Sequence, residues 1–242
     1  CLLFNTGYQA NATIIPALVG PGDAVFSDAL NHASLVDGCR MAKLNGTHVG
    51  IYRHLDLVDL DAQMRAWRAS STGLALVATD GVFSIDGDAA DLPALVELCR
   101  KYGALLSVDE AHATGLLGPS GAGLAELQGV LGQVHVVMGT LGKALGSFGA
   151  FVGGPSLIVD YLLNTARGFT FSTSLPPPVV SAAIKAVELA QTERWRSVKA
   201  LASADRVRGA FGLPHQDSAI FSLIVGDESR AMRLSSQMHG KG

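Results

Sequence analysis

The feature that most constrains the fold is an alternation between short apolar runs and longer amphipathic segments, which continues through the first two thirds of the chain. The runs GLALVATD (73–80), ALLSVDE (104–110) and VHVVMGT (134–140) have the length and composition of buried strands. Strands that alternate with helices in this way are typical of a mostly parallel sheet. The sequence therefore predicts an α/β fold.

The stretch between the first two runs shows how one unit of this pattern is specified. Asp91 is a helix cap and Gly103 a helix stop, and one face between them is apolar. Upstream, the same reading predicts a helix over 33–44, a strand over 47–53 and a helix over 57–69. The apolar face of the 92–102 helix consists of Leu92, Leu95, Val96 and Cys99.

Three consecutive prolines at 176–178 interrupt the pattern of alternating strands and helices, which suggests a domain hinge or a helix start. We expect a large domain over 1–175 and the beginning of a smaller α+β domain over 176–242. The smaller one is predicted to contain two helical stretches, a strand at SAIFSLIVGD (218–227) and a last helix at 228–238. Both ends of the chain read as cut, so we expect the piece to come from a longer protein.

Composition excludes several classes of protein. The 242 residues are 48% hydrophobic and 16% charged, and no apolar run approaches the ~18 residues needed to span a bilayer. The net charge of -3 and the absence of a basic block make nucleic acid an unexpected partner. Cys1, Cys39 and Cys99 fit neither a disulfide framework nor a zinc site. We therefore expect a soluble, cytoplasmic protein without a metal.

Chemistry-bearing side chains follow the carboxyl ends of the predicted strands, where ligands collect in open parallel sheets. One site could therefore receive acids, an imidazole, hydroxyls and a lysine. The residues that follow the three strands are Asp80 and Ser84, Asp109 and His112, and Thr140 and Lys143.

Lys143 is the least ordinary of these residues, although most lysines in loops are solvated surface charges. It carries the only charge between His135 and Val159, and apolar surroundings lower a lysine's pKa toward the nucleophilic amine of a Schiff-base lysine. A phosphate-binding P-loop is excluded because Val137 and Ala144 stand where that motif needs Gly and Ser or Thr. The segment GPSGAG (118–123) likewise lacks the spacing of a nucleophile elbow.

The remaining candidates each have a structural alternative. Asp109 is either a cap or surface acid, or a carboxylate that keeps a heterocyclic nitrogen protonated. His112 is a hydrogen-bond donor to a cofactor or a structural histidine, and His32 either caps a helix or stacks on a flat ring. Gly7 and Tyr8 open a predicted helix, where backbone amides can hold a phosphate.

Taken together, six segments resemble the α-oxoamine synthases, enzymes of the fold-type I class that depend on pyridoxal 5'-phosphate (PLP). The resemblance implies a PLP-binding large domain over 1–175 and a homodimer with shared active sites. The matching segments are TGYQAN (6–11), SDALNHASLVDGCR (27–40), ATDGVFSIDGD (78–88), VDEAHATGLLG (108–118), GTLGKALG (139–146) and FSTSLPPP (171–178).

Residue by residue, the resemblance implies roles for the catalytic group. Lys143 would be the Schiff-base lysine that also moves the Cα proton of the substrate, and Asp109 would pair with the pyridine nitrogen. His112 and Ser84 would address the phenolic oxygen of PLP, and His32 would stack over its ring.

The resemblance also implies phosphate-binding residues. Thr140 and the amides of Gly7 and Tyr8 would hold the phosphate of PLP. Ser172 and Thr173 would reach the phosphate of the neighbouring subunit. The arginine that binds the substrate carboxylate in this family is expected outside this segment.

The family joins an amino acid to an acyl-CoA, in most members with loss of CO2. The stretches NTARGFTFSTSLPPP (164–178) and SAIFSLIVGDESRA (218–231) look most like the member that joins L-alanine to pimeloyl-CoA in biotin synthesis. The alternative within the family joins glycine to acetyl-CoA. A third possibility is a truncated or degenerate scaffold without catalysis, which the yellow colour of bound PLP would distinguish.

Overall fold

The computed structural model describes residues 1–240 and contains one seven-stranded sheet with the order β1-β7-β6-β5-β4-β2-β3. The neighbours from β3 to β6 run parallel, whereas β7 is antiparallel to β6 and to β1. The strands are β1 (Leu2–Phe4), β2 (Ala24–Asp28), β3 (His48–Tyr52), β4 (Ala75–Asp80), β5 (Ala104–Asp109), β6 (Val136–Thr140) and β7 (Ala150–Gly153).

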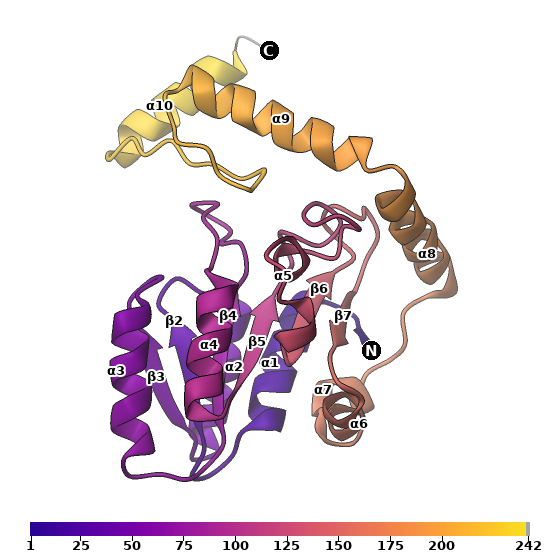
Figure 1. Cartoon of the computed structure of the whole chain (residues 1–242). Helices are drawn as coiled ribbons and strands as arrows, with labels where there is room; N and C mark the ends of the chain where they lie inside the picture. Colours follow the sequence, from indigo (N-terminus) through magenta and orange to yellow (C-terminus); the bar gives the residue numbers. More distant parts are fainter. Residues whose placement is uncertain (241–242) are drawn as a thin grey trace.

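Helices cover both faces of this sheet, as Figure 1 shows, so the predicted α/β class is confirmed. The helices are α1 (Gly7–Leu18), α2 (Ala33–Leu44), α3 (Leu57–Arg68), α4 (Leu92–Tyr102), α5 (Leu124–Leu127), the 3-10 turn η1 (Leu131–Gln133), α6 (Ser156–Thr165), α7 (Arg167–Thr170), α8 (Pro177–Thr192), α9 (Trp195–Ala210) and α10 (Glu228–His239).

Two apolar cores, one on each face, hold the layers together. Alternate side chains of a strand point to opposite faces, so Val77 packs with α3 and α4 whereas Leu76 packs with α1 and α2. Both side chains are fully buried. Because β4 is buried on both faces, it reads as a continuous apolar run rather than an alternating one.

The local signals for α4 act as predicted. The Asp91 carboxylate accepts a hydrogen bond from the Ala94 amide, and Gly103 ends the helix in the left-handed conformation at φ 60°. The predicted apolar face of this helix is buried against the sheet. These signals lie within a few residues of the helix that they delimit, so the sequence alone predicts its bounds.

The segment that begins at the three prolines is an arm of α8, α9 and α10, which crosses over one end of the body in Figure 1 and packs Leu201 and Ile220 against the core on the α3 and α4 face. The strand predicted at 218–227 is wrong, since these residues form no strand. A strand needs a partner with which to exchange backbone hydrogen bonds. Here the buried Arg208 guanidinium donates hydrogen bonds to the carbonyls of Ser218 and Ile220, so these carbonyls have no strand partner. The division into domains at 175/176 stays a prediction.

Candidate functional site

A cleft of about 160 Å³ lies where β4, β5 and β6 end beside the first turns of α1 and α2. The chain reversals after these strands bring polar side chains from distant parts of the sequence to one place, as expected at the carboxyl edge of a parallel sheet. The cleft is lined by Gly7, Tyr8, His32, Ser34, Asp80, Asp109, Ala111, His112, Met138, Thr140 and Lys143.

Asp109 is the last residue of β5 and is only 4% exposed. Burial raises its pKa, and two hydrogen bonds oppose that effect. Its Oδ1 accepts from the Ala111 amide at 2.8 Å and its Oδ2 from Asn11 Nδ2 at 2.6 Å. Both carboxylate oxygens are therefore fixed in direction by donors that favour the ionised form.

Asp80 ends β4 directly beside Asp109 and is also buried. Burial first, and then the neighbouring Asp109 charge, raise the pKa of the Asp80 carboxyl. It accepts from the His32 amide at 2.6 Å, whereas Asp109 accepts from two groups. When the pair holds a proton, Asp80 is therefore the better carrier and Asp109 the better anion.

Lys143 follows β6, and its Nζ lies 2.8 Å from His112 Nε2. Burial lowers the pKa of His112 to about 4, with the Lys143 charge as the next cause. Burial also lowers the pKa of Lys143, against the opposing charges of Asp109 and Asp80. His112 is therefore neutral at pH 7 and accepts a hydrogen bond from the Lys143 amine, which a charged imidazole would repel.

His32 is the N-cap of α2, the structural role that the sequence left open. Its Nδ1 accepts from the Ser34 amide at 3.2 Å and lies 2.7 Å from Ser34 Oγ. The capping role does not exclude a binding role, because the ring also lines the cleft. Ser34 itself is buried and joins the cleft through this contact.

The first turn of α1 lies at the same cleft. The Thr6 hydroxyl and carbonyl accept from the amides of Gln9 and Ala10, which leaves the Gly7 and Tyr8 amides free of intrahelical acceptors. The Tyr8 hydroxyl donates to Asp37. This helix end therefore presents two amides and the positive end of its dipole.

Thr140 closes the cleft from the end of β6. Its hydroxyl donates to the Gly149 carbonyl at 3.1 Å and accepts from the Gly142 amide at 3.2 Å. These bonds shape the loop that carries Lys143.

Three predicted residues lie apart from this cleft. Ser84 is exposed in a turn after β4, and it is not among the lining residues. Ser172 and Thr173 line a separate hollow, where the Asn5 side-chain amide donates to the Ser172 hydroxyl and the Thr173 carbonyl. Within this single chain, the structure thus gathers seven of the ten predicted residues: Gly7, Tyr8, His32, Asp109, His112, Thr140 and Lys143.

Sequence reasoning missed two contributors and undervalued a third. Asn11 and Ser34 are buried polar residues within helices, and no local motif separates them from other helical polar residues. Asp80 follows an apolar run in the sequence, but the motif around it assigns it no role. The available signal was a carboxylate following an apolar run, the same signal that identified Asp109.

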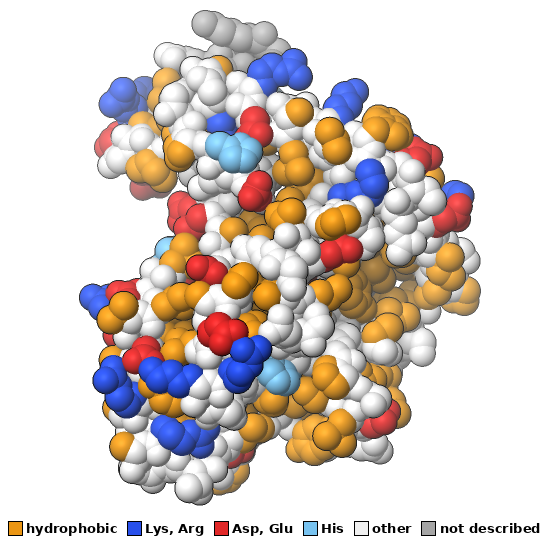
Figure 2. Space-filling view, in the orientation of Figure 1, with side chains coloured by type: hydrophobic (Ala, Val, Ile, Leu, Met, Phe, Trp, Pro, Cys, Tyr) orange, Lys and Arg blue, Asp and Glu red, His pale blue; other side chains and the backbone are white. Residues whose placement is uncertain are grey.

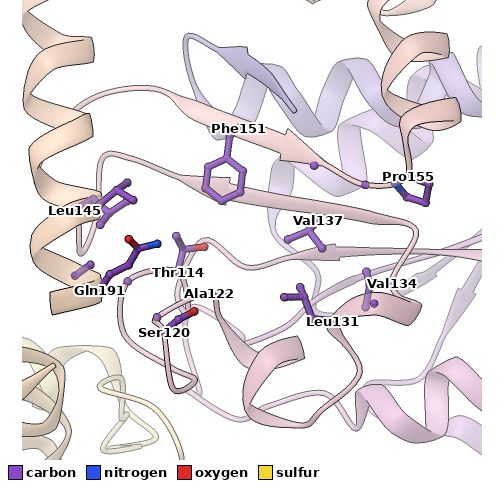
Figure 3. A pocket seen from close by; sticks show the side chains of 17 residues that line it. Thr114, Ser120, Ala122, Leu131, Val134, Val137, Leu145, Phe151, Pro155 and Gln191 are labelled. Atoms are coloured by element: carbon purple, nitrogen blue, oxygen red, sulfur yellow. The ribbon is translucent and has the colours of Figure 1, made fainter.

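A larger cavity of about 600 Å³ lies on the opposite face of β6, where Figure 3 shows Val137, Leu145 and Phe151 among its walls. None of its lining residues is an acid, a base or a histidine. Val137 faces this cavity whereas Met138 faces the cleft, so one strand separates the two spaces. The smaller cleft, which is lined by acids, histidines and a lysine, is therefore the candidate site.

Two negative findings apply to residues 1–240. No helix there is long and apolar enough to cross a membrane. Within the same range, no group of three His, Cys, Asp or Glu side chains is arranged to hold a metal ion.

The sequence and the fold both have known relatives. The 8-amino-7-oxononanoate synthase of Anaeromyxobacter dehalogenans is 48% identical over 246 aligned residues, covering 100% of this chain and 60% of that protein. The chain thus spans about 60% of the length of its curated relatives.

Solved structures show the same similarity. A serine palmitoyltransferase from S. paucimobilis, solved with a bound PLP-myriocin aldimine, has a TM-score of 0.86 and 34% identity, covering 95% of this chain and 60% of that one. The 8-amino-7-oxononanoate synthase from Francisella tularensis has a TM-score of 0.78 and 27% identity, covering 99% and 70%. The profile of one family, aminotransferase class I and II, matches residues 1–241. The chain therefore belongs to the class I and II aminotransferase family.

Proposed function

We propose that this chain is the catalytic part of an 8-amino-7-oxononanoate synthase, a PLP-dependent acyltransferase of biotin synthesis. It would join L-alanine to pimeloyl-CoA and release CoA and CO2. The observation that carries the proposal is the convergence of Lys143, His112, Asp109 and His32 on one cleft, in a chain 48% identical to a synthase of that name.

The residues of the cleft fit PLP by their chemistry. Lys143 is an amine with a lowered pKa, which suits it to bind the aldehyde carbon. The buried Asp109 carboxylate suits a protonated pyridine nitrogen, and the Gly7 and Tyr8 amides suit a phosphate. When bound there, PLP supplies an electron sink for carbanion chemistry at the substrate Cα.

The chain's own residues would then do three things. Lys143 would remove and return the proton at the alanine Cα, since its neighbour His112 is neutral and leaves the amine unrepelled. Asp109 would keep the ring nitrogen protonated through its fixed carboxylate. His32 would pack on the cofactor ring from the N-terminus of α2.

The proposal extends to the assembly. Ser172 and Thr173 lie outside the cleft, so a role in phosphate binding requires the cleft of a second subunit. We therefore include a homodimer with shared sites, located in the cytoplasm, where the three unpaired cysteines stay reduced.

The structural comparison favours one competing activity, because the serine palmitoyltransferase has the higher identity of the two solved structures. The test is an assay of CoA release by the enzyme that contains this chain. L-alanine with pimeloyl-CoA is compared at equal concentrations with glycine and acetyl-CoA and with L-serine and palmitoyl-CoA. We expect the first pair to react fastest. Preference for either other pair would overturn the assignment while keeping the cofactor chemistry.

A further inference from the structure

Four side chains form a continuous hydrogen-bonded row beneath the cleft. Asn11 Nδ2 lies 2.6 Å from Asp109 Oδ2 and 3.0 Å from Ser34 Oγ, and Ser34 Oγ lies 2.7 Å from His32 Nδ1. Asn11, Ser34 and Asp109 are each at most 4% exposed. The row thus joins the acid at the end of β5 to the histidine at the start of α2 through two helices.

The donors and acceptors in the row have one consistent direction. An amide NH2 has two protons, and Asn11 gives one to the Asp109 carboxylate and the other to the Ser34 hydroxyl. Having accepted from Asn11, the Ser34 hydroxyl donates its own proton to His32 Nδ1, which also accepts from the Ser34 amide. His32 therefore keeps its proton on Nε2.

Close packing of α1 on α2 holds the row in place. A Cβ atom at Gly38 would lie 2.7 Å from the Asn11 carbonyl oxygen and 2.9 Å from Ile15 Cδ1. Gly38 lies one helical turn after Ser34, on the same face of α2. The glycine thus permits the helix separation at which Asn11 reaches both Ser34 and Asp109.

The row also has an unusual feature at its centre. Among the described residues, Asn11 Oδ1 is buried and has no hydrogen-bond partner. A buried polar atom without a partner costs stability. The amide is nevertheless held with both protons toward Asp109 and Ser34, because the opposite orientation would set its oxygen against the carboxylate.

We propose that Asn11 and Ser34 are positioning residues that set the charge and direction of Asp109 and the tautomer of His32 as one unit. The inference rests on the proposed function, which makes Asp109 and His32 the cofactor's partners. Asn11 holds the carboxylate toward the pyridine nitrogen, and Ser34 keeps the His32 proton on Nε2. Neither residue needs to touch PLP.

The first measurement uses the enzyme that contains this chain in its cofactor-free form, so it does not depend on the proposed function. Nitrogen-15 NMR of the histidine rings reports which nitrogen of His32 is protonated. We expect the Nε2-H form in the wild type and a smaller share of it in Ser34→Ala, where the hydroxyl donor is lost and only the backbone amide of residue 34 still donates to Nδ1. The matched control is Ser203→Ala, which removes a hydroxyl bonded only to the Lys199 carbonyl in α9. An unchanged His32 tautomer in Ser34→Ala would overturn the role of Ser34.

The second measurement titrates PLP into the cofactor-free enzyme and follows the absorbance of the Lys143 Schiff base. We expect Asn11→Ala to weaken PLP binding about tenfold or more, because a hydrogen bond to a charged group is lost. We also expect the pH midpoint of the absorbance band to shift. The control, Asn164→Ala, removes an exposed helical amide that bonds only to the Asp160 carbonyl.

The outcomes separate the two proposals. If the wild type binds PLP through Lys143 and Asn11→Ala matches it in both affinity and midpoint, the role of Asn11 is wrong. If wild type and Lys143→Ala bind PLP equally, the proposed function fails instead, and the His32 tautomer still decides whether the row exists. Thermal unfolding of each variant shows whether weaker PLP binding follows from a loss of folded protein. A loss of folded protein alone would leave the His32 tautomer of the remaining folded molecules unchanged.

Discussion

The body that carries the sheet and the arm formed by α8, α9 and α10 differ in how much of their apolar surface they bury. In the body, β2 and β4 are buried along their whole length. In the arm, α10 has no buried residue, and Ile184 and Val198 are 66% and 64% exposed. Figure 2 shows apolar side chains on the surface of both regions. The comparison teaches that helices form from local signals, whereas a core needs layers on both sides.

The site follows the same division. All lining residues of the cleft lie between Gly7 and Lys143, within the body. The arm supplies none of them. Substitutions in the body should therefore change chemistry or stability, whereas substitutions at exposed positions of the arm should change neither by much.

The largest expected effect is that of Lys143→Ala in the body. Loss of the covalent amine should slow CoA release by on the order of 10³-fold or more, as for other covalent catalytic groups. Borohydride reduction of the PLP-loaded enzyme followed by peptide mapping should place the label on Lys143. Lys185→Ala in α8 is the control and should keep wild-type activity. A label on Lys185 would contradict the location of the site.

A matched pair of leucines tests the difference in burial directly. Leu76 in β4 is fully buried and Leu234 in α10 is 38% exposed. Leu76→Ala should lower the free energy of unfolding by about 2–5 kcal/mol through lost burial and a cavity. Leu234→Ala should change it by less than about 0.5 kcal/mol. Urea unfolding measures the free energy of unfolding of both variants. Equal decreases would contradict the difference in burial between the body and the arm.

Asp109→Asn should keep the fold of the body and slow the chemistry. A neutral amide cannot hold the ring nitrogen of PLP protonated, and loss of one preorganised electrostatic partner costs on the order of 10²-fold in rate. The measurement is exchange of the alanine Cα proton with deuterated solvent. Exchange at the wild-type rate would assign Asp109 a different role.

The smallest expected effect is the pH dependence that His54 gives to the body. Its Nδ1 lies 2.8 Å from Asp28 and its Nε2 2.8 Å from Asp88. Burial lowers the pKa of His54, but these two carboxylates outweigh it, so the net pKa is raised. A raised histidine pKa stabilises the fold below its ordinary value of about 6.5 and loses that effect as pH rises through the folded value.

We therefore expect stability to fall slightly, by less than about 1 kcal/mol, as the pH rises above the ordinary histidine range. The His54→Gln variant should lose this decline, which unfolding curves at several pH values would reveal. An equal decrease of stability with pH in the wild type and in His54→Gln would assign the pH dependence to another group.

The sequence predicted the elements of the body well because their signals are local. The helix predicted over 33–44 has those bounds in the structure, and Asp91 and Gly103 delimit α4 as expected. The strand predicted at 218–227 failed because a strand depends on a partner far away in the sequence, which the apolar pattern does not reveal.

By itself, the sequence determined which residue types stand at the predicted strand ends: an isolated lysine in an apolar loop, acids, and histidines beside them. Only the tertiary structure decided which of these meet, because the cleft unites groups as distant as Gly7 and Lys143. It also decided that Asn11 faces Asp109 and that Ser34 faces His32. Those contacts depend on the separation of α1 and α2, which Gly38 permits. The physical reason is that a side chain's type is encoded at one position, whereas its partner is set by packing across the whole fold.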